Sequence, residues 1–224
     1  MNEDIKDKII SKANWRIIIR PLKFENEKIE FIDLESIIRN CSISLRGWDY
    51  PHIEQTGSHG RTTSGLDFIQ SETEFRHHIE TWRYYQSGLF IHRFAFPEDG
   101  WGDPTSFWIL GNLYRITEIY EFASNLATRD VLGDGIRILV NIYNTQNRSL
   151  SFTDRSIELG NYECKVNELS YSQDFSKTDL VGNAHDIAMD RIIWIFQRFG
   201  WNSKAVSNIL KPFQDEFISG KLIY

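Results

Sequence analysis

Residues 45–53, LRGWDYPHI, bring together three side chains that could act on one ligand. Arg46 can bind a phosphate or carboxylate through two parallel hydrogen bonds, Asp49 can orient an imidazole, and His52 can exchange protons near neutral pH. The glycine and the proline of this stretch would bend the backbone so that the three side chains converge. The alternative is a structural corner, in which Arg46 and Asp49 form a local ion pair while the neighbouring tryptophan and tyrosine fill the core. Because no established motif accompanies these residues, the corner is favoured.

Three further cationic side chains, Arg83, His92 and Arg93, lie on the clearest β pattern of the chain. Two aromatic, β-branched runs, 79–85 and 89–96, flank a glycine-containing turn, which is typical of a hairpin. Neighbours on a strand point to opposite faces, and neither set is purely apolar, so both faces should be covered. These cations, with Arg46 and His52, could bind an anionic small molecule such as a nucleotide. A solvated sheet face with cross-strand pairs is the alternative.

Other residue patterns argue against metal and catalytic sites. His77 and His78 are adjacent, so on a strand they would point in opposite directions, and no cysteine or carboxylate completes a zinc site at helical spacing. The glycine-containing segment 54–65 lacks the strand and the Lys-Ser/Thr pair of a phosphate-binding loop, and no Gly-x-Ser-x-Gly elbow occurs. Glu118 and Glu121 share one helix face, as solvated pairs do. The sequence therefore predicts no catalytic residue, no metal and no cofactor.

Composition describes an ordinary folded chain with many aromatic residues. The 224 residues suit a single domain, and 41% hydrophobic with 25% charged residues is typical of globular proteins. Aromatic residues make up 14%, including seven tryptophans, which indicates a large core, a partner surface or both. The net charge of −6 and the scattered cations disfavour nucleic acid as a partner.

Cysteine spacing and hydropathy predict a reduced, cytosolic protein. Cys41 and Cys164 are far apart and form neither a disulfide framework nor a zinc motif. The charged N-terminus lacks the apolar run of a signal peptide, and no apolar stretch is long enough to cross a bilayer, so no membrane association is expected.

Hydrophobic periodicity predicts a single α+β domain over residues 1–224, with a mixed or antiparallel sheet, a central hairpin, one long central helix and a C-terminal helical pair at about 179–218. Strands are predicted at 15–20, 42–45, 66–69, 79–85, 89–96, 136–143, 149–153 and 162–169. Helices are predicted at 1–13, 31–40, 106–127, 179–199 and from 202 onward. The strand at 149–153 should pair with 136–143, residues 54–65 and 97–105 should be loops, and Pro212 should kink or break the last helix.

Three segments resemble a group of uncharacterised bacterial proteins, some of which also carry a Schlafen/AlbA-like DNA-binding domain. The segments are LRGWDYPH at 45–52, WRYYQSGLFIH at 82–92 and ITEIYEF at 116–122. The likeness covers about residues 15–200 and brings no catalytic motif, and the extra domain is not recognisable in this chain. The resemblance implies a bacterial accessory module in a defence or regulatory system.

The leading functional hypothesis is a non-enzymatic interaction or accessory subunit that docks to a larger protein or to itself. It rests on the lack of a catalytic motif, on the tryptophans Trp48, Trp82, Trp101 and Trp201, and on the apolar C-terminal residues Leu222, Ile223 and Tyr224. Trp101, Trp201 and the three C-terminal residues are the predicted interface. The alternative is an enzyme or sensor that binds an anionic small molecule through Arg46, His52, Arg83 and Arg93.

Overall fold

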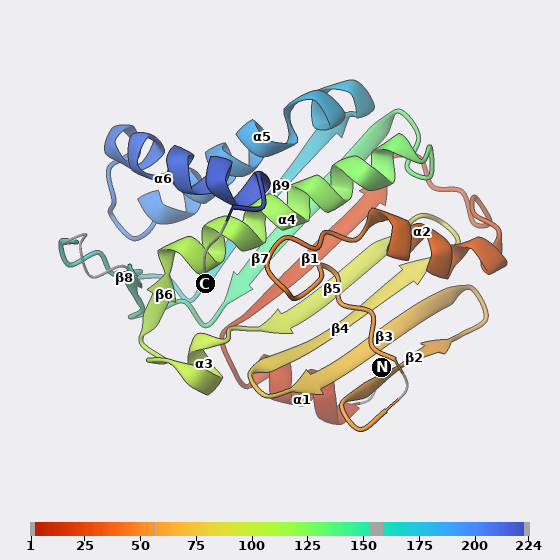
Figure 1. The fold of residues 1–224 in the computed structure, drawn as a ribbon, viewed down its shortest axis with the longest axis horizontal. Helices are drawn as coiled ribbons and strands as arrows, with labels where there is room; N and C mark the ends of the chain where they lie inside the picture. Colours follow the sequence, from red (N-terminus) through yellow and green to blue (C-terminus); the bar gives the residue numbers. More distant parts are fainter. Residues whose placement is uncertain (1–2, 56, 153–158, 222–224) are drawn as a thin grey trace.

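The computed structural model describes residues 3–55, 57–152 and 159–221 and contains a seven-stranded antiparallel sheet (Figure 1). The strand order is β2-β3-β4-β5-β1-β7-β9, and every pairing between neighbours is antiparallel. The strands are β1 (Asn14–Pro21), β2 (Gly60–Ser64), β3 (Phe68–Phe75), β4 (His78–Tyr85), β5 (Phe90–Ala95), β7 (Gly135–Tyr143) and β9 (Glu168–Ser176). The predicted α+β class and the β4–β5 hairpin are confirmed.

The two faces of the sheet are covered unequally. One face carries α2 (Leu34–Cys41), α4 (Ile109–Thr128), α5 (Lys177–Gln197) and α6 (Ser203–Ile218), with α4 running along the sheet (Figure 1). The short helix α1 (Glu3–Ile10) packs against β4 and β5 through a small cluster of its own, formed by Ile5, Ile9, Ile79 and Ala95. The remaining elements are a 3-10 turn η1 (Phe31–Asp33), α3 (Glu98–Trp101), and the parallel pair β6 (Ser106–Trp108) and β8 (Ser149–Ser151). Among the described residues, no helix has both the length and the apolar character needed to cross a membrane.

Strand β1 shows how the alternation of side chains divides the two faces. Trp15, Ile17 and Ile19 are at most 1% exposed and belong to the main core beneath the helices. Arg16 and Arg20 alternate with them and therefore point to the opposite face. The same alternation continues in the neighbouring strands, so the sheet has a helix-covered apolar face and a more polar face.

Helix α4 is the central packing element, as predicted. The six residues of its predicted apolar stripe are all fully buried: Ile109, Leu113, Ile116, Tyr120, Ala123 and Ala127. Thr117 and Glu118 are buried as well: Thr117 accepts a hydrogen bond from Gln214 of α6, and Glu118 lies against Arg46 of the segment after α2. The helix is consequently surrounded by protein on most sides, which brings polar side chains into the interior.

Several predicted strand positions are wrong. Residues 60–64, expected in a loop, form edge strand β2, whereas 42–45 contributes only the isolated bridge between Ile43 and Tyr50. Strand β9 lies at 168–176 and not at 162–169, and the long strand β3 extends beyond the predicted 66–69. Polar residues at exposed edges and in buried pairs hide the apolar alternation of these strands.

The predicted pairing of 149–153 with 136–143 is also wrong, because β8 pairs with β6 and β7 pairs with β9. Arg148 explains this departure. Its guanidinium forms a 2.5 Å ion pair with Asp99 and donates to the carbonyl oxygen of Ser106 at 3.1 Å. These contacts hold the chain after β7 against α3 and β6.

Two helix expectations also need correction. The long helix begins at Ile109, because Ser106–Trp108 is strand β6. Helix α6 runs through Pro212, so the expected break there is wrong, and within α5 Asn183 has a non-helical backbone (φ −135°, ψ 20°).

Candidate ligand-binding cavity

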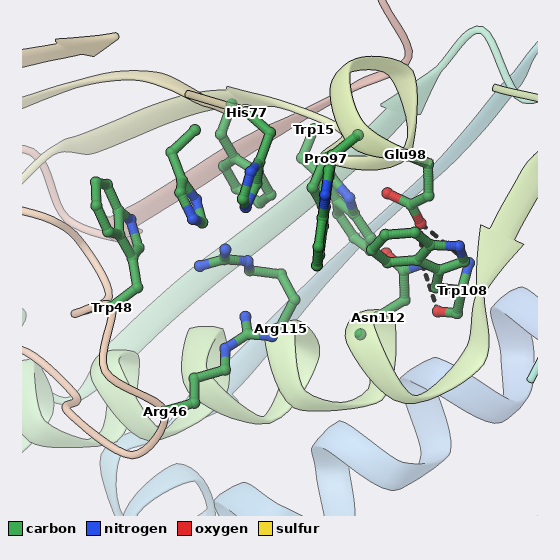
Figure 2. Close-up of a pocket in the computed structure, with 13 residues that line it drawn as sticks. Trp15, Arg46, Trp48, His77, Pro97, Glu98, Trp108, Asn112 and Arg115 are labelled. Atoms are coloured by element: carbon green, nitrogen blue, oxygen red, sulfur yellow. Dashed lines mark hydrogen bonds between the residues drawn. The ribbon is translucent and has the colours of Figure 1, made fainter. Parts of the chain in front are cut away.

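A cavity of about 270 Å³ lies between one end of the sheet and the first half of α4 (Figure 2). The segment around Arg46 and Trp48 borders it on one side, and α3 borders it on the other. Its lining consists of Trp15, Arg46, Trp48, His77, His78, Phe94, Pro97, Glu98, Trp101, Trp108, Gly111, Asn112 and Arg115. Aromatic and imidazole rings form most of the walls, and a small number of charged groups interrupt them.

Two arginines at the cavity share one buried carboxylate. Arg46 donates two hydrogen bonds of 2.8 Å to the two oxygens of Glu118, and Arg115 Nη1 lies 3.2 Å from Glu118 Oε2. The Glu118 side chain is 0% exposed, whereas the arginines are 18% and 14% exposed. Figure 2 shows both guanidinium groups beside the space bordered by Trp48. Glu118 thus holds two guanidinium groups close together at this wall, and the charge of Arg115 also interacts with the nearby carboxylate of Glu80.

Glu80 supports the wall from within the sheet. Its carboxylate accepts a 2.7 Å hydrogen bond from Trp48 Nε1 and lies 2.8 Å from His92 Nε2. Burial opposes ionisation of Glu80, but the His92 contact, the charge of Arg115 and the Trp48 hydrogen bond outweigh it and lower the pKa to about 2. Burial lowers the pKa of His92, so the neutral imidazole can donate from Nε2. Glu80 therefore holds the indole ring of Trp48 in place.

A continuous row of stacked rings forms one wall of the cavity. Trp48 lies between His52 and His78, with centroid distances of 4.0 Å to each. At the other end of the row, Trp101 stacks on His77 at 5.1 Å and 14° between planes. Burial, with the nearby charges of His77, Arg115 and Arg46, lowers the pKa of His78 to about 4 despite the opposing effect of Glu80. The imidazole of His78 is consequently neutral at neutral pH.

Glu98 occupies the end of the cavity beside Trp108 (Figure 2). It is 2% exposed and accepts hydrogen bonds from the Trp108 backbone N–H at 3.0 Å and from Asn112 Nδ2 at 3.5 Å. Burial raises the pKa of its carboxyl group, although the backbone N–H of Trp108 and the charge of Arg148 partly offset the effect. Arg148 holds the adjacent Asp99 and thereby helps to position α3.

The predicted ligand-binding residues are divided among several places. Arg46 lines the cavity, and His92 lies behind it as the partner of Glu80. Asp49 and His52 line a separate surface hollow with Arg39 and Glu54, although the His52 ring also stacks on Trp48. Arg83 and Arg93 line a hollow on the opposite face of the sheet. The six residues therefore do not form one site.

The predicted local ion pair between Arg46 and Asp49 is wrong. Arg46 pairs instead with Glu118, and Tyr50 is fully buried while Trp48 is half-buried at the cavity. The expectation that Glu118 is solvated, like Glu121, is also wrong for Glu118. The sequence signal for a buried Glu118 was its place in the ITEIYEF segment of a largely apolar helix. A helix that is apolar on several sides is buried on those sides, together with the charges among its apolar residues.

His77 and His78 also depart from the prediction that they point in opposite directions. Arg76 and His77 form the turn between β3 and β4, with Arg76 in the left-handed region (φ 55°), so strand alternation does not apply. The two imidazole centroids are 4.2 Å apart, and both rings line the cavity. Within the described ranges, no group of three or more His, Cys, Asp or Glu residues could hold a metal ion.

The predicted interface residues differ in their exposure. Trp101 is 72% exposed at the cavity rim, whereas Trp201 is 4% exposed and stacks on Tyr162. Trp82 is buried and donates from Nε1 to the His52 carbonyl oxygen at 2.6 Å. Leu222, Ile223 and Tyr224 lie outside the described residues.

Comparison of the chain with protein-family models, with curated proteins and with solved structures found no match in any of the three. The resemblance to the bacterial proteins associated with Schlafen/AlbA-like domains therefore stays a prediction.

Proposed function

We propose that the protein binds a small aromatic or heteroaromatic acid in this cavity and acts as a binding protein or sensor. The observation that carries the proposal is the pair of arginines, Arg46 and Arg115, that share the single carboxylate of Glu118 at a ring-lined wall. This arrangement has a place for a negative charge and a place for a planar ring within one small volume.

The acidic group of the ligand is assigned to the arginine pair. Each guanidinium has five N–H donors, and Glu118 occupies two on Arg46 and one on Arg115. Two guanidinium groups held near one another repel, and burial strengthens the repulsion. A carboxylate or phosphate at this position would relieve it and would form charge-assisted hydrogen bonds.

The ring of the ligand is assigned to the space beside this row of stacked rings. The stack runs from Trp48 through His78 and His77 to Trp101, with centroid distances of 4.0, 4.2 and 5.1 Å. Trp15, Phe94 and Trp108 add further apolar lining. The volume of about 270 Å³ lies just below the usual range of about 300–1,000 Å³ for ligand pockets. The size therefore favours a single ring system with a short acidic substituent over a whole nucleotide.

A calorimetric titration with matched probes tests this assignment. Indole-3-acetate carries a planar ring and a carboxylate, indole-3-ethanol lacks the charge, and adenosine monophosphate is larger. We expect the acid to bind about tenfold or more tightly than the alcohol, because a hydrogen bond to a charged group contributes about 1.5–3 kcal/mol. Equal affinity for the acid and the alcohol, or binding of neither, would contradict the proposal.

Docking to a second protein molecule is the other candidate, and the exposure of Trp101 favours it. An indole that is 72% exposed beside a cavity could serve as an aromatic anchor in an interface. Light scattering of the purified chain over a range of concentrations tests self-association, with Trp101→Ala as the comparison. A mass that stays monomeric in both proteins removes support for a homo-oligomer through this residue.

A further inference from the structure

The sheet face opposite the cavity has a cationic hollow of about 430 Å³ beside α1. Arg16 of β1, Arg93 of β5 and Arg83 of β4 line it, together with Lys6 of α1 and Thr81 of β4. Tyr85 and Ile91 complete its lining. The sheet separates this hollow from the helix-covered face that holds the cavity.

Two of these arginines are direct neighbours across the sheet. Arg16 is opposite Arg93 in the antiparallel β1–β5 register, and Arg93 is opposite Thr81 in the β4–β5 register. Like charges directly opposite one another destabilise an antiparallel pair. Burial and the charge of Arg16 both lower the pKa of Arg93, while Tyr143 opposes this effect.

Two acidic groups of this face, Glu72 and Asp174, have other partners. Glu72 of β3 is opposite Thr81 in the antiparallel β3–β4 register, and its carboxylate lies 3.7 Å from Arg61. Asp174 is held by Arg137 through contacts of 2.5 and 2.7 Å. The ion pairs found among the described residues include none with Arg16 or Arg93.

Two buried polar atoms at the hollow also lack an internal partner. Thr81 is 1% exposed, and its hydroxyl oxygen has no hydrogen-bond partner within the described part of the chain. The same is true of Arg16 Nε. Buried polar groups in folded proteins are normally hydrogen-bonded, so such atoms at the wall of a hollow point to a ligand that completes them.

We infer that Arg16, Arg93 and Thr81 form a second binding site, whose ligand is a phosphate-type oxyanion. The guanidinium groups can each donate two hydrogen bonds to a tetrahedral oxyanion, and the threonine hydroxyl can donate one more. Lys6 and Arg83 add positive charge at the margin, although Arg83 Nε already donates to Gln70 at 2.8 Å. The small extent of the cluster and the net charge of −6 favour one phosphate group over a polynucleotide backbone.

Thermal unfolding and calorimetry with inorganic phosphate test this site, with sodium chloride at the same ionic strength as the reference. We expect phosphate to raise the melting temperature of the wild type more than chloride does. In Arg93→Gln the phosphate effect should disappear and the dissociation constant should rise at least about tenfold. The melting temperature without phosphate should not fall, because the variant loses a like-charge contact.

Arg137→Gln is the matched control, since it removes one positive charge from the same face but leaves Arg16 and Arg93 in place. It should keep the full response to phosphate, whereas Thr81→Val and Arg16→Gln should weaken it. Phenyl phosphate distinguishes the source of the group: binding equal to that of inorganic phosphate indicates an esterified ligand, and weaker binding indicates free phosphate.

Three results would overturn the inference. The wild type could respond no more to phosphate than to chloride, or Arg93→Gln and Arg137→Gln could lose the response equally. A short single-stranded oligonucleotide that binds where inorganic phosphate does not would assign the surface to nucleic acid instead.

Discussion

Arg46 and Glu118 are 72 residues apart in the chain, yet they form a two-bond ion pair with both distances at 2.8 Å. Glu118 comes from the buried interior of α4, and Arg46 comes from the irregular segment between α2 and β2. The pair thus fixes this segment, including Trp48, against the long helix. One interaction supports both the fold around the cavity and the charge at its wall.

Replacement of Arg46 by alanine should destabilise the protein by about 3 kcal/mol. Loss of one partner of a buried ion pair typically costs about 3–5 kcal/mol, and Arg115 at 3.2 Å still compensates part of the Glu118 charge. The free energy of unfolding measured in urea provides the test.

Arg39→Ala is the control for this substitution. Arg39 forms a 2.6 Å ion pair with Glu35, but both side chains are about half exposed, so we expect a change below about 1 kcal/mol. If Arg46→Ala costs no more than Arg39→Ala, the buried pair does not hold the segment.

The His78→Asn variant should have a weaker pH dependence of stability than the wild type. The pKa of His78 is about 4 in the folded protein and 6.5 ordinarily, so the unfolded chain binds a proton that the folded chain excludes. This contribution to stability is complete above pH 6.5 and is lost as the pH falls toward 4. Because asparagine does not titrate, the free energy of unfolding of the variant should decline less between about pH 7.5 and pH 5 than that of the wild type.

Urea unfolding of both proteins at the two pH values measures the difference. Burial also lowers the pKa of His77 and His92, so part of the decline should persist in the variant. Glu80 contributes only below its ordinary value of 4.5, because its pKa is lowered to about 2. An equal decline in both proteins would contradict the burial of a neutral His78.

Trypsin should cleave after Lys23 before it cleaves after Arg61. Arg61 belongs to β2, which is hydrogen-bonded to β3, so the backbone must open locally before a protease can bind it. Lys23 lies in the segment after β1, and its side chain is 87% exposed. Mass spectrometry of early digestion products identifies the first cut, and initial cleavage at Arg61 would show that β2 is not stably paired.

The elements with clean periodicity could be predicted from the sequence. The stripe of α4 recurs every three to four residues, and the β4–β5 hairpin combines aromatic runs with a turn at Gly88 (φ 80°), so local patterns sufficed. The strand at β8 was predicted, but its pairing with β6 could not be, because it depends on the long-range contacts of Arg148 with Asp99 and Ser106.

The cavity was harder to predict than the fold. Arg46 was identified from its residue type, but its partner Glu118 is brought close only by the packing of α4. Arg83 and Arg93 looked similar to Arg46 in the sequence, although strand parity places them on the other face. Residue type indicated which side chains could bind an anion, whereas tertiary packing decided which of them share a site.

Titration of indole-3-acetate into the wild type, Trp101→Ala and Phe24→Ala is the most direct test of the proposed cavity. Trp101 and Phe24 are similarly exposed, at 72% and 73%, but only Trp101 lines the cavity. We predict that Trp101→Ala weakens binding about tenfold at an unchanged melting temperature, while Phe24→Ala binds like the wild type. Equal affinity in all three proteins, or no binding to the wild type, would contradict a ligand site in this cavity.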